Sequence, residues 1–365
     1  MPDSPDNSRR DFLTGKSARD AVRNAGDQLA DAIVGDNPAP SGGSTLRLTQ
    51  RAMACEFSVV LNPGCHEHMP IASDALRIVE PLEDQMSVYR EQSELSRLNR
   101  AAADGPVVVE RNLFNLLKQA LEISRATDGA FDPTSGPLLA LWQTCREENR
   151  LPTDEEIERC LQIVGVEHVL ADDERCSIVF DTNGLELNLG GIGKGYALDH
   201  MAAQITSHDV DDFLLHGGYS SILASGGHND TGGWPVGIGN PLFTDKRMGT
   251  LLLKDKAMST SGSNIQYFRV AGQRYGHILD PRTGWPVEDL LSVTVLADTA
   301  AEADALSTAF FVIGVENARR CCDTLDGVGI IMIPFPERGR KVTPTAIGIP
   351  DDTLFWDYDQ VERVG

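Results

Sequence analysis

The sequence predicts a fold of the α+β class: a single large domain in which mixed or antiparallel sheets are flanked by helices. Amphipathic helical patterns dominate the first half of the chain, and short strands separated by glycine turns dominate beyond residue 175. Helices that gather before strands are typical of α+β proteins, because α/β proteins alternate the two in regular succession. With 365 residues, 41% of them hydrophobic, the chain can bury a full core, which excludes an intrinsically disordered protein.

Three segments are expected along the chain: an N-terminal arm and linker (residues 1–45), a folded body (residues 46–340) and a C-terminal tail (residues 341–365). Arg9 and Arg10 lie in a segment that resembles a twin-arginine export motif. Polar residues follow them, however, where an export signal needs about 7–15 apolar residues. We therefore expect a cytoplasmic protein, with export as the alternative. No stretch reaches the roughly 18 apolar residues of a transmembrane helix.

Within the body, residues 53–61 are expected to form a strand, and residues 71–86 and 111–127 to form amphipathic helices. Asp154 opens a further helix, because the acidic residues after it suit the positive end of the helix dipole. Two later helices are expected at residues 194–206 and 300–313. The later strands are expected at residues 177–181, 185–189, 212–216, 234–239, 249–254, 274–279 and 291–297. Cys321 and Cys322 are expected on a helix as buried or half-buried thiols.

The net charge and the cysteine content argue against several classes of binding partner and structural site. The chain has 32 Lys and Arg against 54 Asp and Glu, a formal net charge of −22. This charge argues against nucleic acid or an anionic membrane as a partner. A phosphorylated ligand is not excluded, because a local cation or metal can reverse the field at one site. The seven cysteines are odd in number and contain no CxxC pair, which argues against a disulfide framework and a structural zinc site.

A glycine turn at residues 188–195 precedes the helix expected from residue 194. Such a turn directs backbone N–H groups and a helix N-terminus at an anion, and Lys194 adds a positive charge. The P-loop pattern GxxxxGKS/T fails, because Asn188 stands where its first glycine is needed and Gly195 follows the lysine. Two interpretations stay open: a phosphate-binding turn, or a tight strand–helix turn with a surface lysine.

Further candidates lie towards the C-terminus. Residues 259–264 are expected to form a hydroxyl-rich turn, and residues 275–284 a strand that ends in a tight turn. Thr299 is expected to cap the next helix, which carries Asp304 and Thr308 four residues apart on one face. A carboxylate and a hydroxyl at this spacing can offer two hard ligands to Mg²⁺. The alternative is an Asp and a Thr on a solvated helix face.

Taken together, these motifs resemble the ApbE family of FAD:protein FMN transferases. Each motif is short, but they occur in the family's order from about Met53 to Pro334. The matching segments are MACEF (53–57), SVYREQSELSRLN (87–99), GAFDPTSGPL (129–138), LGGIGKGYALD (189–199), TSG (260–262), HILDPRTG (277–284) and ADALSTA (303–309). The resemblance implies an ApbE-like (T-fold-like) domain. It also implies a reaction in which a Ser or Thr hydroxyl of a target protein attacks the FMN-side phosphorus of FAD and AMP leaves.

The resemblance also assigns roles by position. Asp304 and Thr308 match the family's Mg²⁺ ligands, as does the carbonyl of Gly191, and Lys194 matches a contact to the flavin nucleotide. The other positions that match FAD contacts are Met53, Tyr89, Ala130, Phe131, Asp132, Asn188 and Ile278. His277 is our choice of general base, because an unperturbed imidazole titrates at about pH 6.5. Asp280 is the alternative base.

Three departures from the family pattern bear on function. Cys55 follows Ala54 where the family often has Gly-Thr, Asn188 replaces the usual acid, and Tyr219 replaces the Asp of the common Gly-Gly-Asp. The last two leave open an FAD-binding protein without transferase activity. A metal-dependent FAD pyrophosphatase, in which water replaces the protein hydroxyl, is a further alternative. FAD is itself anionic, so the net charge of −22 predicts that its binding depends on Lys194, backbone amides and Mg²⁺.

Overall fold

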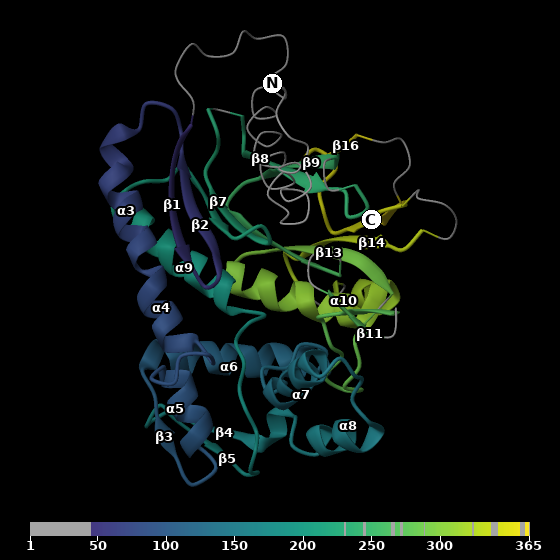
Figure 1. The fold of residues 1–365 in the computed structure, drawn as a ribbon. Helices are drawn as coiled ribbons and strands as arrows, with labels where there is room; N and C mark the ends of the chain where they lie inside the picture. The colour runs from purple at the N-terminus through teal and green to yellow at the C-terminus, as the bar shows by residue number, and fades with distance from the viewer. Residues whose placement is uncertain are drawn as a thin grey trace, which may run out of the picture.

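A nine-stranded sheet forms the centre of the computed structural model, which describes residues 45–229, 231–243, 246–263, 267–270, 273–287, 289–322, 325–336, 342–357 and 362–364 (Figure 1). The strands are, in sheet order, β1 (Leu46–Ala52), β2 (Cys55–Leu61), β6 (Phe213–Gly217), β7 (Ser221–Ser225), β10 (Lys256–Gly262), β13 (Leu290–Ala297), β14 (Gly329–Pro334), β15 (Thr345–Ile347) and β17 (Glu362–Val364). Neighbouring strands run antiparallel as far as β15, which pairs with β17 in parallel.

The two faces of this sheet are both covered, and alternation along each strand sorts its side chains between them. On β2, Phe57 and Val59 face a core shared with the helices, whereas Val60 faces the other side. That other side is covered by a smaller sheet of β8 (Trp234–Gly239), β9 (Arg247–Leu253) and β16 (Leu354–Trp356). The central sheet therefore lies between a helical layer and a second sheet (Figure 1).

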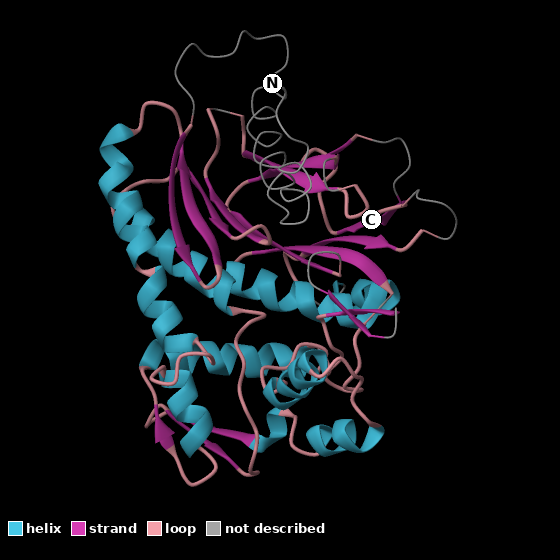
Figure 2. Cartoon of the chain, in the orientation of Figure 1, coloured by secondary structure: helices cyan, strands magenta, loops and turns pink. Residues whose placement is uncertain are grey.

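Two long helices pack on the helical face and carry most of the later argument: α9 (Gly193–Thr206) and α10 (Ala300–Cys322). The other helices are α3 (Met69–Arg77), α4 (Val79–Met86), α5 (Glu94–Ala101), α6 (Arg111–Ala126), α7 (Gly136–Glu147) and α8 (Asp154–Leu161), with 3-10 turns η1 (His66–His68) and η2 (Val166–His168). Figure 2 shows α5 to α8 gathered on the far side of α9 and α10 from the central sheet. Two small sheets accompany them: β3 (Val107–Val108), β5 (Ser177–Phe180) and β4 (Val169–Asp172) in one, β11 (Tyr267–Val270) and β12 (Gln273–Gly276) in the other.

The α+β prediction is confirmed, and several element predictions need correction. The strand predicted at 53–61 begins at Cys55, because Met53 and Ala54 form the β1–β2 turn with φ of 49° and 57°. The helix predicted at 71–86 is divided between α3 and α4 at Ile78. The predicted strand at 185–189 is extended chain rather than a sheet strand, since the backbone of Leu187 pairs with the side-chain amide of Asn99.

Near the C-terminus, the predicted hydroxyl-rich turn is wrong for residues 259–262, which belong to strand β10, and Asn264 lies outside the described residues. The strand predicted at 274–279 ends at Gly276. Cys321 and Cys322 end helix α10 as half-buried thiols, as predicted. The chain beyond residue 341, expected as a tail, contributes β15, β16 and β17.

The N-terminal arm and its Arg9-Arg10 pair lie almost entirely outside the described residues, so cytoplasmic localisation stays a prediction. Among the helices that the structure describes, none combines the length and apolar character needed to cross a bilayer.

Candidate functional site

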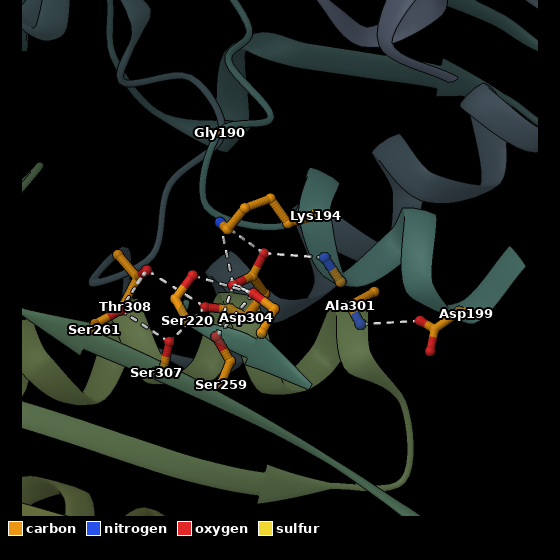
Figure 3. A network of polar contacts seen from close by, with 12 residues as sticks. Gly190, Lys194, Asp199, Ser220, Ser259, Ser261, Ala301, Asp304, Ser307 and Thr308 are labelled. Carbon is orange, nitrogen blue, oxygen red and sulfur yellow. Dashed lines mark hydrogen bonds and ion pairs between the residues drawn. The ribbon is translucent and has the colours of Figure 1, made fainter. Parts of the chain in front are cut away.

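The carboxylate of Asp304 lies at the centre of a polar network between α10, α9 and the strands β7 and β10 (Figure 3). Its side chain is 5% exposed. One oxygen, Oδ1, accepts hydrogen bonds from the hydroxyls of Ser259 (2.7 Å) and Ser221 (2.9 Å). Both serines lie on central strands, so two hydrogen bonds from the sheet fix the position of this carboxylate oxygen. A buried carboxylate needs such partners, because its desolvation is otherwise costly.

The first turn of α9 supplies the partners of the other oxygen. The Gly195 amide donates to Oδ2 at 3.1 Å, and the ammonium of Lys194 lies 3.3 Å from Oδ2 and 3.5 Å from Oδ1. Gly195 is required here, because a Cβ at this position would lie 1.9 Å from the carbonyl oxygen of Ala300. The close approach of α9 and α10 therefore explains why no Ser or Thr follows the lysine, as a P-loop would require.

Asp199 fixes α10 relative to α9. Its carboxylate accepts hydrogen bonds from the amides of Ala300 (2.7 Å) and Ala301 (2.9 Å) at the start of α10. Burial raises the pKa of Asp199 to about 6, and these two hydrogen bonds act against the rise. The hydroxyl of Thr299 accepts from the Glu302 amide (3.2 Å), which confirms the predicted cap. The helix start is thus held so that Asp304 faces Lys194.

Thr308 lies one turn after Asp304 and is drawn with it in Figure 3. Its hydroxyl is 3.3 Å from that of Ser261, which also lies 2.9 Å from the hydroxyl of Ser307. A Cβ added at Gly191 would come 3.5 Å from the Thr308 hydroxyl oxygen and 3.2 Å from the Phe131 ring. The fold therefore brings together the three residues expected to bind Mg²⁺: Gly191, Asp304 and Thr308.

This donor set fits Mg²⁺. It offers one carboxylate, one hydroxyl and one backbone carbonyl, all hard oxygen donors, and Mg²⁺ in proteins keeps several waters beside one or two carboxylates. In the part of the chain that the structure describes, three or more His, Cys, Asp or Glu side chains do not gather at any point as a metal-binding group would. A transition-metal site rich in imidazole or thiolate is therefore not supported there.

Three of the positions expected to contact FAD lie outside the helices and strands. Met53 occupies the β1–β2 turn, where its amide donates to Glu83 (2.9 Å). Asn188 shapes the glycine turn, because its side-chain oxygen accepts from the Gly190 amide (2.8 Å). Tyr89 is 84% exposed, an unusual fraction for an aromatic side chain. Of these residues, Tyr89 exposes its ring to a ligand, whereas the Gly190 amide is already used within its own turn.

The segment 129–132 joins the glycine turn to the residues 277–284. Ala130 and Phe131 are buried, with the Phe131 ring beside Gly191, and a Cβ at Gly129 would come 3.7 Å from Cγ of Arg282. Asp132 accepts from the Thr134 hydroxyl (2.6 Å) and amide (2.8 Å), and burial raises its pKa. The Asp132 carboxylate therefore stabilises the turn to Thr134, in which it already accepts two hydrogen bonds.

His277 and Asp280, the predicted bases, occupy different environments within one turn. His277 is exposed, whereas the neighbouring Ile278 is buried. The carboxylate of Asp280 accepts two hydrogen bonds from the Arg282 guanidinium, both at 2.8 Å, and one from the Arg282 amide at 3.0 Å. The Asp280 carbonyl accepts from the Gly284 amide (2.8 Å). Asp280 thus stabilises the turn that presents His277.

The structure adds residues that the sequence reasoning did not assign to the site. Ser221 and Ser259 bind Asp304, and Asp199 caps α10. Ser259 and Asp199 lie in segments that the sequence had singled out, whereas Ser221 does not. Cys55 is a fourth. Burial raises the pKa of its thiol, and the charges of Lys194 and Asp304 act on it in opposite directions. A Cβ at Gly218 would lie 3.3 Å from the Cys55 sulfur, so the turn that carries Tyr219 adjoins this part of the site.

Comparison with known proteins gives one consistent result. The sequence model of the ApbE family matches residues 53–332. The FAD:protein FMN transferase of Vibrio cholerae is 32% identical over 286 residues, covering 77% of this chain and 84% of that protein. That of Escherichia coli K12 is 34% identical over 261 residues, covering 69% and 73%. The crystal structure of the ApbE protein from Thermotoga maritima matches with a TM-score of 0.74 and 32% identity, covering 82% of this chain and 96% of that one.

Proposed function

The chain belongs to the ApbE family, and from that premise we propose that it is an FAD:protein FMN transferase. The observation that carries the proposal is the network around Asp304, in which the family's motifs at residues 189–199, 260–262 and 303–309 meet. The chain covers 84% of the Vibrio cholerae relative and 96% of the Thermotoga maritima structure, so the similarity extends over most of each.

In the proposed reaction, the hydroxyl of a Ser or Thr in a target protein attacks the FMN-side phosphorus of FAD. A new P–O bond joins FMN to the target, the bond between that phosphorus and the bridging oxygen breaks, and AMP leaves with the oxygen. The hydroxyl proton passes to a base. Such phosphoryl transfers depend on positioning and on electrostatic stabilisation more than on covalent participation of the protein.

Lys194 and the glycine turn are proposed to bind the pyrophosphate. The glycine turn leads into the N-terminus of α9, where the helix dipole attracts anions, whereas the amides of Gly190, Ile192 and Gly193 already donate within the turn. Within a chain of net charge −22, this helix N-terminus and Lys194 supply the local positive field that an anionic substrate requires. Tyr89, with 84% of its surface exposed, is proposed to contact the flavin.

Mg²⁺ is proposed to be held by Asp304, Thr308 and the Gly191 carbonyl. When bound, it would withdraw negative charge from the pyrophosphate and lower the cost of the charge on the leaving AMP. The chain's own contribution is to hold the ligand oxygens in place: Ser221 and Ser259 fix one oxygen of Asp304, and Ser261 lies within hydrogen-bond distance of Thr308.

His277 is proposed as the base that takes the hydroxyl proton. It is exposed, so a target protein can reach it, and histidine is the side chain that most often serves as a general base. Asp280 is the less suitable alternative, because its two oxygens are already bound by the Arg282 guanidinium. A carboxylate in a bidentate pair is a weak proton acceptor, since protonation would break the pair.

The test is direct. The purified protein is incubated with FAD, Mg²⁺ and a candidate target protein, and intact mass spectrometry follows the target. An added mass equal to FMN less one water, with one AMP released per FMN attached, supports the transferase. Tight FAD binding with neither transfer nor AMP release would support the FAD-binding alternative, which the departures at Asn188 and Tyr219 motivate. Steady release of FMN and AMP without a target would support the pyrophosphatase.

A further inference from the structure

Lys194 is the cation that neutralises the buried Asp304 in this structure. The carboxylate makes five polar contacts: two with serine hydroxyls, one with the Gly195 amide, and one from each oxygen to the Lys194 ammonium. A carboxylate has about four lone-pair positions. Its acceptor capacity is therefore used by the protein itself, and a metal ion can bind Asp304 when one of these partners leaves.

The contacts with Asp304 differ in strength, and Lys194 is the one that can leave. The serine hydroxyls lie at 2.7 and 2.9 Å from Asp304 and come from central strands, whereas the ammonium lies at 3.3 and 3.5 Å. Charge-assisted N–H···O contacts are usually about 2.7–2.9 Å long. The Lys194 side chain is 25% exposed and ends a flexible stem, so its ammonium can turn towards solvent without moving the backbone.

We propose that Lys194 is an exchangeable counterion of the metal site: a divalent cation that binds Asp304 displaces the ammonium, which then turns to the phosphates of FAD. The inference rests on the proposed Mg²⁺ site and adds a role for Lys194 beyond simple contact with the nucleotide. Two cations compete for one carboxylate, and the displaced cation becomes free for the anionic substrate. Metal and FAD therefore bind with positive coupling, and this coupling is reciprocal.

The exchange makes an unusual prediction for Lys194→Met. Removing a binding residue normally weakens a site, but removing a competing cation should strengthen metal binding. We expect the full-length variant without FAD to bind Mn²⁺ about tenfold more tightly than the wild type, because a unit charge next to the metal ligand is lost. Free Mn²⁺ is measured by electron paramagnetic resonance during titration of metal-stripped protein.

Two matched variants control this experiment. Lys194→Arg keeps the positive charge, so its Mn²⁺ affinity should stay within about threefold of the wild type. Lys118→Met makes the same charge change on α6, where Lys118 pairs with Asp173 at the surface, and should leave Mn²⁺ binding unchanged. Circular dichroism checks that each variant is folded.

FAD binding supplies the second readout. In the wild type, Mg²⁺ should raise the affinity for FAD, and in Lys194→Met this enhancement should shrink because no ammonium is released to the phosphates. A measurement on the unmodified protein is independent of any folding defect: Mn²⁺ should increase the rate at which an amine-reactive ester labels Lys194, with Lys118 as the internal reference in the same peptide digest.

The outcomes separate this inference from the proposed function. Tighter Mn²⁺ binding by Lys194→Met, with weaker coupling to FAD, supports the exchange. Equal or weaker Mn²⁺ binding by that variant, together with unchanged labelling of Lys194 in the wild type, overturns the exchange and leaves the transferase intact. Absence of Mn²⁺ binding in both proteins overturns the metal site, and the exchange with it.

Discussion

Asp304 and Asp280 are two poorly exposed carboxylates that each pair with a cation, but the fold builds the two pairs in opposite ways. Asp280 binds Arg282 only two residues away, through two contacts of 2.8 Å. Asp304 binds Lys194 across 110 positions of sequence, at 3.3 and 3.5 Å, and takes its shorter contacts from Ser221 and Ser259. The Asp280–Arg282 pair is short-range in sequence and has both carboxylate oxygens bound by the guanidinium. The Asp304–Lys194 pair has longer contacts and is formed by tertiary structure.

The difference shows where the protein can do chemistry. A bidentate Arg–carboxylate pair is specific in geometry and leaves both partners occupied, which suits a turn that must hold its shape. A single ammonium at long distance neutralises a charge without fixing it, which suits a carboxylate that must exchange partners. Asp304 can therefore exchange its partner for a ligand, whereas Asp280 holds the shape of the turn that carries His277.

The largest expected effect comes from Asp304→Asn, which removes the charge and keeps the shape. We expect transfer activity to fall by about 1000-fold, the scale of losing a major electrostatic group from an active site. The fold should survive, because Lys194 can turn its ammonium to solvent once its partner is neutral. Measured turnover and thermal unfolding check both statements. Activity within tenfold of the wild type would contradict the role of Asp304.

His277→Ala is expected to come next. Loss of a general base should lower the rate of transfer by about 100-fold and leave the dissociation constant of FAD within about threefold. Asp280→Asn tests the alternative base, and we expect a loss of less than about tenfold, because the amide can still accept from Arg282. Equal losses of transfer and FAD binding would instead make His277 a ligand contact, and a larger loss at Asp280 would reverse the assignment.

Tyr219→Ala should have a smaller effect and tests the surroundings of the Asp304–Lys194 pair. Tyr219 is 65% exposed and stands two residues before Ser221, next to the Asp304 network. If its ring stacks on FAD, its removal should weaken FAD binding about fivefold, the low end of what aromatic stacking on a base contributes. Equilibrium titration of flavin fluorescence measures it. Stronger binding by Tyr219→Ala would show that the tyrosine obstructs the site.

The sequence could predict the local contacts of this site but not those that tertiary structure creates. The Asp280–Arg282 turn and the i, i+4 pair Asp304 and Thr308 are local patterns, and both are visible as short motifs. Asn188 bonding to the Gly190 amide is local as well. By contrast, Ser221 and Ser259 reach Asp304 because β7 and β10 are neighbours in the sheet, and no spacing along the chain encodes that pairing.

The fold shows the same limit. The helices at 111–127 and 194–206 follow from their patterns within one or two residues, since amphipathic periodicity is a local property. The segment 185–189 has the alternation of a strand, but its backbone pairs with the Asn99 side chain and, through an isolated bridge, with residues 133–136. Likewise, the hydroxyl-rich segment 259–262 has the composition of a turn but forms part of the central strand β10 because it pairs with β13. Tertiary contacts override local preference in both cases.

Asp199 sharpens the comparison with a third carboxylate, one that pairs with backbone amides of Ala300 and Ala301 and not with a cation. Burial raises its pKa to about 6, whereas an Asp in an unfolded chain titrates at about 3.9. The folded protein therefore holds this proton more tightly, and the resulting stabilisation is complete below about pH 4 and is lost as the pH rises through about 6. Between pH 5 and 7 the loss should be about 1 kcal/mol.

Asp199→Asn isolates this small effect, because the amide keeps an oxygen acceptor for the start of α10 but does not titrate. The free energy of unfolding of the wild type minus that of the variant, measured with urea at both pH values, should fall by the same amount from pH 5 to pH 7. A difference that rises with pH would mean that the two amides and the helix dipole outweigh burial, and that the Asp199 carboxylate is stabilised in its charged form. In that case a buried carboxylate needs no cation beside it here, and the pairing of Asp304 with Lys194 would stand out further as a functional arrangement.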